Sequence, residues 1–137
     1  MKTVFGNVDI PTRSRRELVD ITQRVEKIVG ESGIENGMCL VHSLHSTTGI
    51  VINEHEEGLM DDILTKIASD YENGKNWLHD RIDNNADAHL ASTSTGPSKV
   101  MPVKGKHLLR GTWQNIFLLE LDGPRANRRI VVEVLGE

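Results

Sequence analysis

Ile116-Phe117-Leu118-Leu119-Glu120-Leu121 is the strongest strand signal in this chain. A short apolar run that is bounded by turn signals predicts a buried strand. Asp122-Gly123-Pro124-Arg125 follows it as a turn. Arg129 to Leu135 then alternates, as in a strand with one buried face. Together with Val100 to Val103, these segments predict an antiparallel meander of three strands.

Further strands are predicted upstream of this meander. Lys2–Ile10 mixes β-branched and polar residues and is interrupted by Pro11. Because proline is tolerated at the edge of a sheet, we expect an edge strand there. Glu17–Ile21, Gly37–His45 and the compact β-branched run Ile50–Ile52 indicate three more strands.

Three segments have the periodicity of helices. The first is predicted to start with Thr22 as its N-cap and to end at Gly30 or Gly33. Leu59–Ile67 carries apolar residues every three to four positions, which predicts an amphipathic helix packed on the sheet. Asn85–Ser94 is predicted as a short third helix. Grouped strands and segregated helices predict one compact α+β domain over residues 1–137, mostly antiparallel.

Composition narrows the class of protein. Hydrophobic residues make up 37% of the 137 residues and charged residues 26%, an ordinary globular balance. The net charge is −4, which argues against a binder of nucleic-acid backbones. The arginines near both ends of the chain are interpreted mainly as solvated turn residues. Cys39 is the only cysteine and is expected in the core. Without an apolar leader or membrane span, we expect a cytoplasmic protein.

Three histidines occur in polar stretches of three different segments. His45 follows a predicted strand, His79 lies in a long connection, and His89 falls in the first turn of a predicted helix. Three histidines with an open fourth position make a catalytic zinc site. The alternative is that each ring is merely exposed or hydrogen-bonded. Asp80, Asp83 and Asp87 are candidate acceptors that would orient the rings.

Other polar residues near these histidines could bind or activate a substrate. Glu54, at the far end of the strand after His45, is the candidate general base; a helix-start acid is the plainer interpretation. Ser46-Thr47-Thr48 and Arg125 could bind a phosphate group, although ordinary turns share this composition. Trp113 is expected to be largely buried, in the core or at a subunit contact.

Several motifs in this order resemble the YjbQ family, whose members are described as secondary thiamine-phosphate synthases. The resemblance spans nearly the whole chain, and Ser46, His55, Met101 and Lys106 depart from the family pattern. The motifs are His45-Ser46-Thr47-Thr48, Ile52-Asn53-Glu54, Asn85-Ala86-Asp87-Ala88-His89-Leu90, Gly96-Pro97-Ser98, Gly111-Thr112-Trp113-Gln114 and Asp122-Gly123-Pro124-Arg125.

The resemblance implies a compact α+β trimer whose pocket holds His45, His79 and His89. It also implies an enzyme that joins hydroxymethylpyrimidine diphosphate to thiazole phosphate, giving thiamine phosphate and pyrophosphate, either as its main or as a side activity. A divalent metal, zinc first, would assist, with Glu54 or Asp87 as catalytic groups. Two alternatives are a metal-dependent hydrolase of a phosphorylated or acyl metabolite and a non-catalytic module that binds a small anion.

Overall fold

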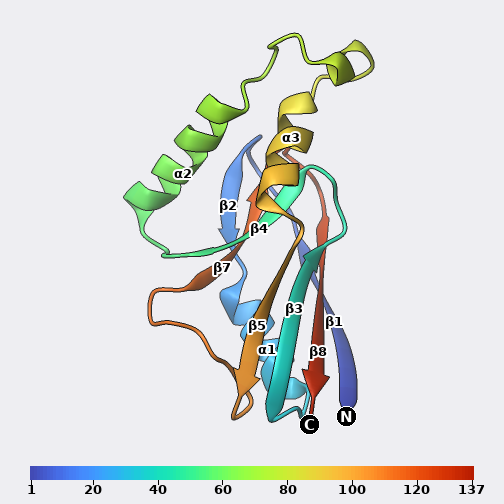
Figure 1. The fold of residues 1–137 in the computed structure, drawn as a ribbon, viewed down its shortest axis with the longest axis vertical. Helices are drawn as coiled ribbons and strands as arrows, with labels where there is room; N and C mark the ends of the chain where they lie inside the picture. Colours follow the sequence, from blue (N-terminus) through green and yellow to red (C-terminus); the bar gives the residue numbers. More distant parts are fainter.

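The computed structural model describes residues 1–137 as two antiparallel sheets flanked by helices, an α+β fold (Figure 1). The helices are α1 (Thr22–Glu31), α2 (Glu57–Asp70) and α3 (Ala86–Thr95), with one 3-10 turn, η1, at Leu78–Arg81. The strands are β1 (Lys2–Ile10), β2 (Glu17–Asp20), β3 (Asn36–Ser43), β4 (Thr48–Asn53), β5 (Ser98–Lys104), β6 (His107–Leu108), β7 (Asn115–Glu120) and β8 (Arg128–Gly136).

The order of the strands corrects the predicted meander. The five-stranded sheet has the order β1-β8-β3-β5-β6, and the three-stranded sheet has the order β2-β7-β4. The strand at Ile116–Leu121 therefore lies in a different sheet from the strands at Val100–Val103 and Arg129–Leu135. The edge position predicted for Lys2–Ile10 is confirmed, because β1 pairs only with β8.

The burial of β7 explains this separation. Ile116 and Leu118 point into a core of 17 buried residues that the larger sheet and α1 share. Phe117 and Leu119 point the other way, into a second core of six buried residues under α2 and α3. A strand whose two faces are both buried needs a packed layer on each side. In β8, buried residues alternate with half-buried or exposed ones, so this strand fits the larger sheet, which has one open face.

The helices follow the prediction with one correction. Thr22 is the first residue of α1 and not its N-cap; its backbone N–H and hydroxyl both donate to Asp20. α2 is instead capped by Glu56, whose carboxylate accepts bonds from Gly58 and Leu59 N–H. No residue of α2 is fully buried. Figure 1 accordingly shows α2 as an outlying helix beside the smaller sheet.

The core holds Cys39 as predicted, fully buried between its sheet neighbours. Burial raises the pKa of the Cys39 thiol to about 12, and the Glu26 charge adds to the shift. This thiol therefore stays protonated and inert at neutral pH. None of the helices is long and apolar enough to cross a membrane.

Candidate functional site

The first turn of α3 holds a buried carboxylate, Asp87, that collects positive charge. Arg15 Nη2 donates to Oδ1 at 3.0 Å, and Arg16 Nη2 donates to Oδ2 at 2.6 Å. Asn73 Nδ2 adds a third donor at 3.0 Å. Burial alone raises the pKa of Asp87, but these bonds and the two guanidinium charges outweigh it, so the pKa lies below its usual value. Asp87 is therefore an ionised anchor for two arginines.

Asn85 connects this anchor to a histidine. Its Nδ2 donates to Asp122 Oδ2 at 2.8 Å, which leaves its Oδ1 facing His79 Nε2 at 3.1 Å. Because the amide oxygen can only accept, this arrangement makes Nε2 of His79 the donor and leaves Nδ1 without a partner in the chain. Asp122 also pairs with Arg15 at 3.4 Å and with Arg125 at 2.9 Å.

A small hollow adjoins this network where η1 meets α3. Figure 1 shows the start of α3 near the top of the view. The rings of His79 and His89 meet edge to face there, with their centres 4.7 Å apart. The hollow has a volume of about 300 Å³ and is mostly apolar; its lining is Trp77, Leu78, His79, Ala86, His89 and Leu90. It could receive a small heterocyclic ring, with polar contacts from the two imidazoles.

His45 lies apart from this histidine pair, in the loop between β3 and β4. Its Nε2 accepts the backbone N–H of Arg129 at 2.8 Å, so the ring supports the chain near the start of β8. Burial lowers the pKa of His45, and the Arg128 charge lowers it further, against the opposing charge of Glu120. The imidazole is therefore neutral at pH 7.

One chain does not assemble the predicted zinc site. No group of three or more His, Cys, Asp or Glu side chains is arranged to hold a metal ion. The structure brings His79 and His89 together, but His45 makes its contacts elsewhere. The three-histidine site therefore stays a prediction.

The acidic residues proposed to orient the histidines act on other groups. Asp80 accepts the backbone N–H of Ala86 at 3.0 Å and so supports the start of α3. Asp83 accepts the neighbouring N–H of Asn84, while Asp87 binds the arginines. The ring partner of His79 is instead the amide of Asn85. Sequence alone suggested carboxylates because these are common partners of ligating histidines.

The hydroxyl groups of the Ser46–Thr48 segment differ in their availability. Thr47 Oγ1 accepts from Arg128 at 2.9 Å, and Thr48 Oγ1 lies 2.6 Å from Ser43 Oγ. Both threonines are buried, whereas Ser46 is exposed. Thr47 and Thr48 therefore fix the loop, and only Ser46 presents its side chain to solvent.

Glu54 is not placed next to His45. It follows β4, whereas the His45 loop precedes it, so the six-residue strand separates them by about 17 Å at 3.3 Å per residue. Glu54 is half-buried. Its catalytic role stays a prediction that one chain does not support by proximity.

Sequence reasoning missed the main ion pairs. Arg15 and Arg16 are anchored, not solvated turn residues, and their partner lies 72 and 71 residues away. Arg128 and Glu120 form a second pair at 2.6 Å, to which Thr12 donates at 2.6 Å. The one available signal was a glutamate inside the apolar run 116–121, which requires a buried partner.

Trp113 corrects another expectation. The side chain is 70% exposed and stands in the turn before β7, so it does not belong to the core of this chain. Its indole N–H has no bonding partner within the chain, unlike that of Trp77, which donates to Glu72 O at 2.9 Å. The placement of Trp113 at a subunit contact stays a prediction.

Comparison with known proteins gives a consistent result along the chain. The family model described as UPF0047 protein YjbQ-like matches residues 6–137. A UPF0047 protein of Archaeoglobus fulgidus is 48% identical over 126 residues, which cover 92% of this chain and 97% of the relative. UPF0047 protein YugU of Bacillus subtilis is 34% identical, with 97% and 100% covered.

Solved structures agree with this sequence similarity. A YbjQ-like protein of unknown function from Sulfolobus solfataricus P2 superimposes with a TM-score of 0.98 at 56% identity, covering 99% of both chains. A hypothetical protein from Aeropyrum pernix K1 gives a TM-score of 0.94 at 39% identity, covering 100% of both chains. The chain therefore belongs to the YjbQ-like family of UPF0047 proteins.

Proposed function

We propose that this chain is a small-molecule enzyme of the thiamine-phosphate synthase type. It would join hydroxymethylpyrimidine diphosphate to thiazole phosphate. A C–N bond forms between the pyrimidine methylene and the thiazole nitrogen while the C–O bond to the diphosphate breaks. The bonding electrons leave with pyrophosphate, and thiamine phosphate is the second product.

The observation that carries this proposal is an arginine cluster beside an apolar hollow. Three guanidinium groups, from Arg15, Arg16 and Arg125, meet two carboxylates, Asp87 and Asp122. The local balance is one positive charge in excess, and Arg15 and Arg125 are partly exposed. Guanidinium groups held by carboxylates are pre-oriented donors for a diphosphate.

Each part of this site would have a different role in the reaction. The hollow between η1 and α3 would accept the pyrimidine ring, and the arginines would stabilise the charge on the departing pyrophosphate. Asp87 is a positioning residue, because it contacts the arginines and is itself fully buried. His79, oriented by Asn85, would donate or accept a hydrogen bond at the reacting ring.

The binding of a divalent metal stays a prediction. The residues of one chain do not fit a three-histidine zinc site, since only His79 and His89 lie together. No step above depends on a metal ion. Metal analysis of the purified protein, with His45→Ala and His89→Ala beside wild type, tests this prediction directly.

We also propose that the chain forms a homotrimer. Large apolar side chains stay exposed on the open face of the five-stranded sheet, among them Phe5, Met38 and Val100. A hollow of about 200 Å³ opens on the same face. Contiguous apolar surface of this kind is typical of association sites. Light scattering at micromolar concentration should give three times the 15.3 kDa chain mass; a monomer would reject this.

The activity is tested by incubating the protein with both substrates and measuring thiamine phosphate and pyrophosphate. We expect product with wild type, a loss of at least about tenfold in Arg15→Gln, and no loss in the control Arg110→Gln. Arg110 contacts Glu26 and Gln114, outside this cluster. Release of inorganic phosphate from one substrate alone would favour the hydrolase. Binding of either substrate without turnover would favour the anion-binding module.

A further inference from the structure

A second groove, unrelated to the η1–α3 hollow, lies beside β2 on the other part of the fold. It has a volume of about 450 Å³ and shares no lining residue with the first hollow. Five polar side chains line the groove, and the apolar part of its wall includes Leu18, Val19 and Met60. The polar residues are Arg13, Glu17, Asp20, Arg24 and His55.

His55 is held in this groove by Asp20. The Nδ1 atom of His55 lies 2.5 Å from Asp20 Oδ2, and the ring packs at a tilt against Phe117 with centres 5.4 Å apart. An ionised carboxylate can only accept, so Nδ1 carries the proton and Nε2 is left without a partner in the chain. The ring thus presents a defined, uncommitted nitrogen at the groove.

Asp20 is a firm support for this ring. Besides His55, it accepts from the backbone N–H and hydroxyl of Thr22, at 2.9 and 2.6 Å, and from Asn115 Nδ2 at 2.8 Å. Burial raises the pKa of Asp20, but the bonds from His55, Thr22 and Asn115 outweigh it, and the pKa lies below its usual value. Asp20 therefore stays ionised at neutral pH.

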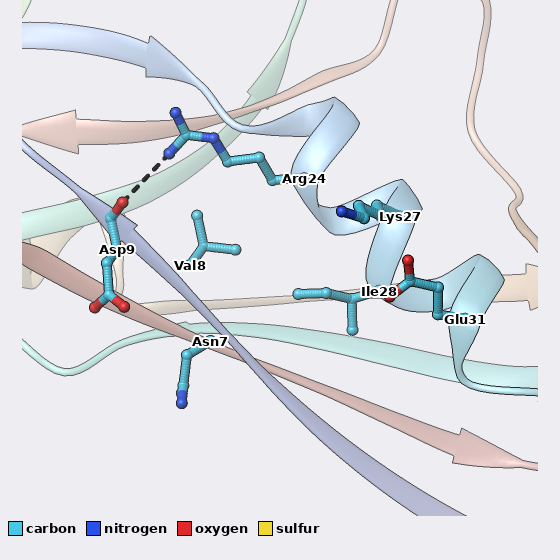
Figure 2. Close-up of a pocket in the computed structure, with 7 residues that line it drawn as sticks. All are labelled: Asn7, Val8, Asp9, Arg24, Lys27, Ile28 and Glu31. Carbon is cyan, nitrogen blue, oxygen red and sulfur yellow. Dashed lines mark hydrogen bonds between the residues drawn. The ribbon is translucent and has the colours of Figure 1, made fainter.

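The two arginines of the groove are largely uncommitted. Figure 2 shows Arg24 reaching from α1 to the backbone of Asp9, its one bond, at 3.4 Å. The guanidinium of Arg13 makes no hydrogen bond within the chain; only its backbone N–H does, to Glu17 at 2.6 Å. Both carboxylates of the groove are thus engaged, whereas the donors of both guanidinium groups remain available.

We propose that this groove binds the phosphate group of a small phosphorylated ligand. Arg13 and Arg24 supply two positive charges and free guanidinium donors, and the ring of His55 lines the same groove. Leu18, Val19 and Met60 would contact an apolar part of the ligand. Two guanidinium groups on separate segments can bind a tetrahedral dianion from two directions.

The charges that line the groove balance one another. They are Asp20 and Glu17 from β2, Arg13 from the preceding loop and Arg24 from α1. The two carboxylates already accept hydrogen bonds, Asp20 from Thr22 and Asn115 and Glu17 from the backbone N–H of Arg13, whereas the guanidinium groups have few partners. The affinity for a dianion should therefore depend mainly on the two arginines.

Sulfate is the test probe, because it is a tetrahedral dianion at neutral pH. Calorimetry on the full chain at pH 7 should show saturable sulfate binding. Arg13→Gln and Arg24→Gln should each weaken this binding at least about threefold. The control His107→Asn, at an exposed residue outside the groove, should leave it unchanged.

Ring proton NMR of the wild type gives a readout that needs no variant. Sulfate should move the His55 signals and leave those of His107 in place. Failure of the His55 signals to move, or unchanged sulfate affinity in a folded Arg24→Gln variant, would overturn the proposal. The condensation assay uses a different pocket, so its outcome does not affect this test.

Discussion

The fold contains two arginine–carboxylate clusters that differ in their access to water. In the first, the side chains of Arg128 and Glu120 are 5% and 0% exposed. The hydroxyl of Thr12 donates to Glu120, and Arg128 donates to the hydroxyl of Thr47. In the second, Asp87 is 0% exposed but its partner Arg15 is 36% exposed. A fully enclosed pair can only hold the structure, whereas an arginine that is anchored on one side and open on the other can also bind an anion.

The largest effect should come from the enclosed cluster. Glu120→Gln removes the charge that compensates Arg128 and leaves a guanidinium without a counter-ion in the interior. Breaking a buried pair in this way costs about 3–5 kcal/mol of the free energy of unfolding. Urea denaturation of wild type and variant measures this difference, and a cost below about 1 kcal/mol would show that water reaches the pair.

Asp87→Asn should have a smaller effect on stability and a larger one on function. Its arginines are partly solvated, so the expected cost is about 1–2 kcal/mol. Loss of the anchor charge should lower the condensation activity at least tenfold. If the variant is stable and fully active, Asp87 does not position the arginines. Asp122→Asn, measured in parallel, reports on the neighbouring half of the cluster.

The pH dependence of stability should reflect both clusters. The folded pKa values of Glu120 and Asp87 lie below their ordinary values of 4.5 and 3.8. For Glu120, burial raises the pKa, but the bonds from Arg128, Thr12 and the Asp122 N–H outweigh it. This stabilisation is fully present above the unfolded pKa values and is lost as pH falls below about 4.5 through the folded values. Urea midpoints from pH 7 to pH 3 should therefore decline, and less steeply in Glu120→Gln.

Trp113→Ala should cost the isolated chain least. An exposed indole contributes little to folding, so the loss should stay below about 1 kcal/mol in a dilute, monomeric sample. If Trp113 lies at a subunit contact, the same variant should lower the apparent mass in sedimentation. A large stability loss without any change of mass would contradict the exposed position.

Local sequence pattern predicted most elements, because periodicity and turn residues act over short distances. Lys2–Ile10, the α2 stripe and the Gly96-Pro97 end of α3 are examples. The pattern could not say that β7 joins a separate sheet, since an apolar run does not record which strands border it. Nor could it pair Arg15 with Asp87 across 72 residues, because only the fold sets that contact.

The candidate site was predicted in part. The polar start of α3 and the meeting of His79 with His89 match the sequence analysis. His45 is also a histidine in a polar stretch of the sequence, yet its ring accepts a hydrogen bond from the backbone N–H of Arg129 in β8. Residue type alone does not tell a ring that supports the backbone from one that lines a hollow.

Pyrophosphate binding, measured by calorimetry in Arg15→Gln and wild type, tests the central claim most directly. That claim is that the half-exposed arginine cluster beside the His79–His89 hollow is the functional site. We predict that wild type binds pyrophosphate and that Arg15→Gln loses at least about tenfold in affinity while its unfolding free energy falls by less than about 1 kcal/mol. Unchanged pyrophosphate affinity in a folded Arg15→Gln variant would contradict the claim.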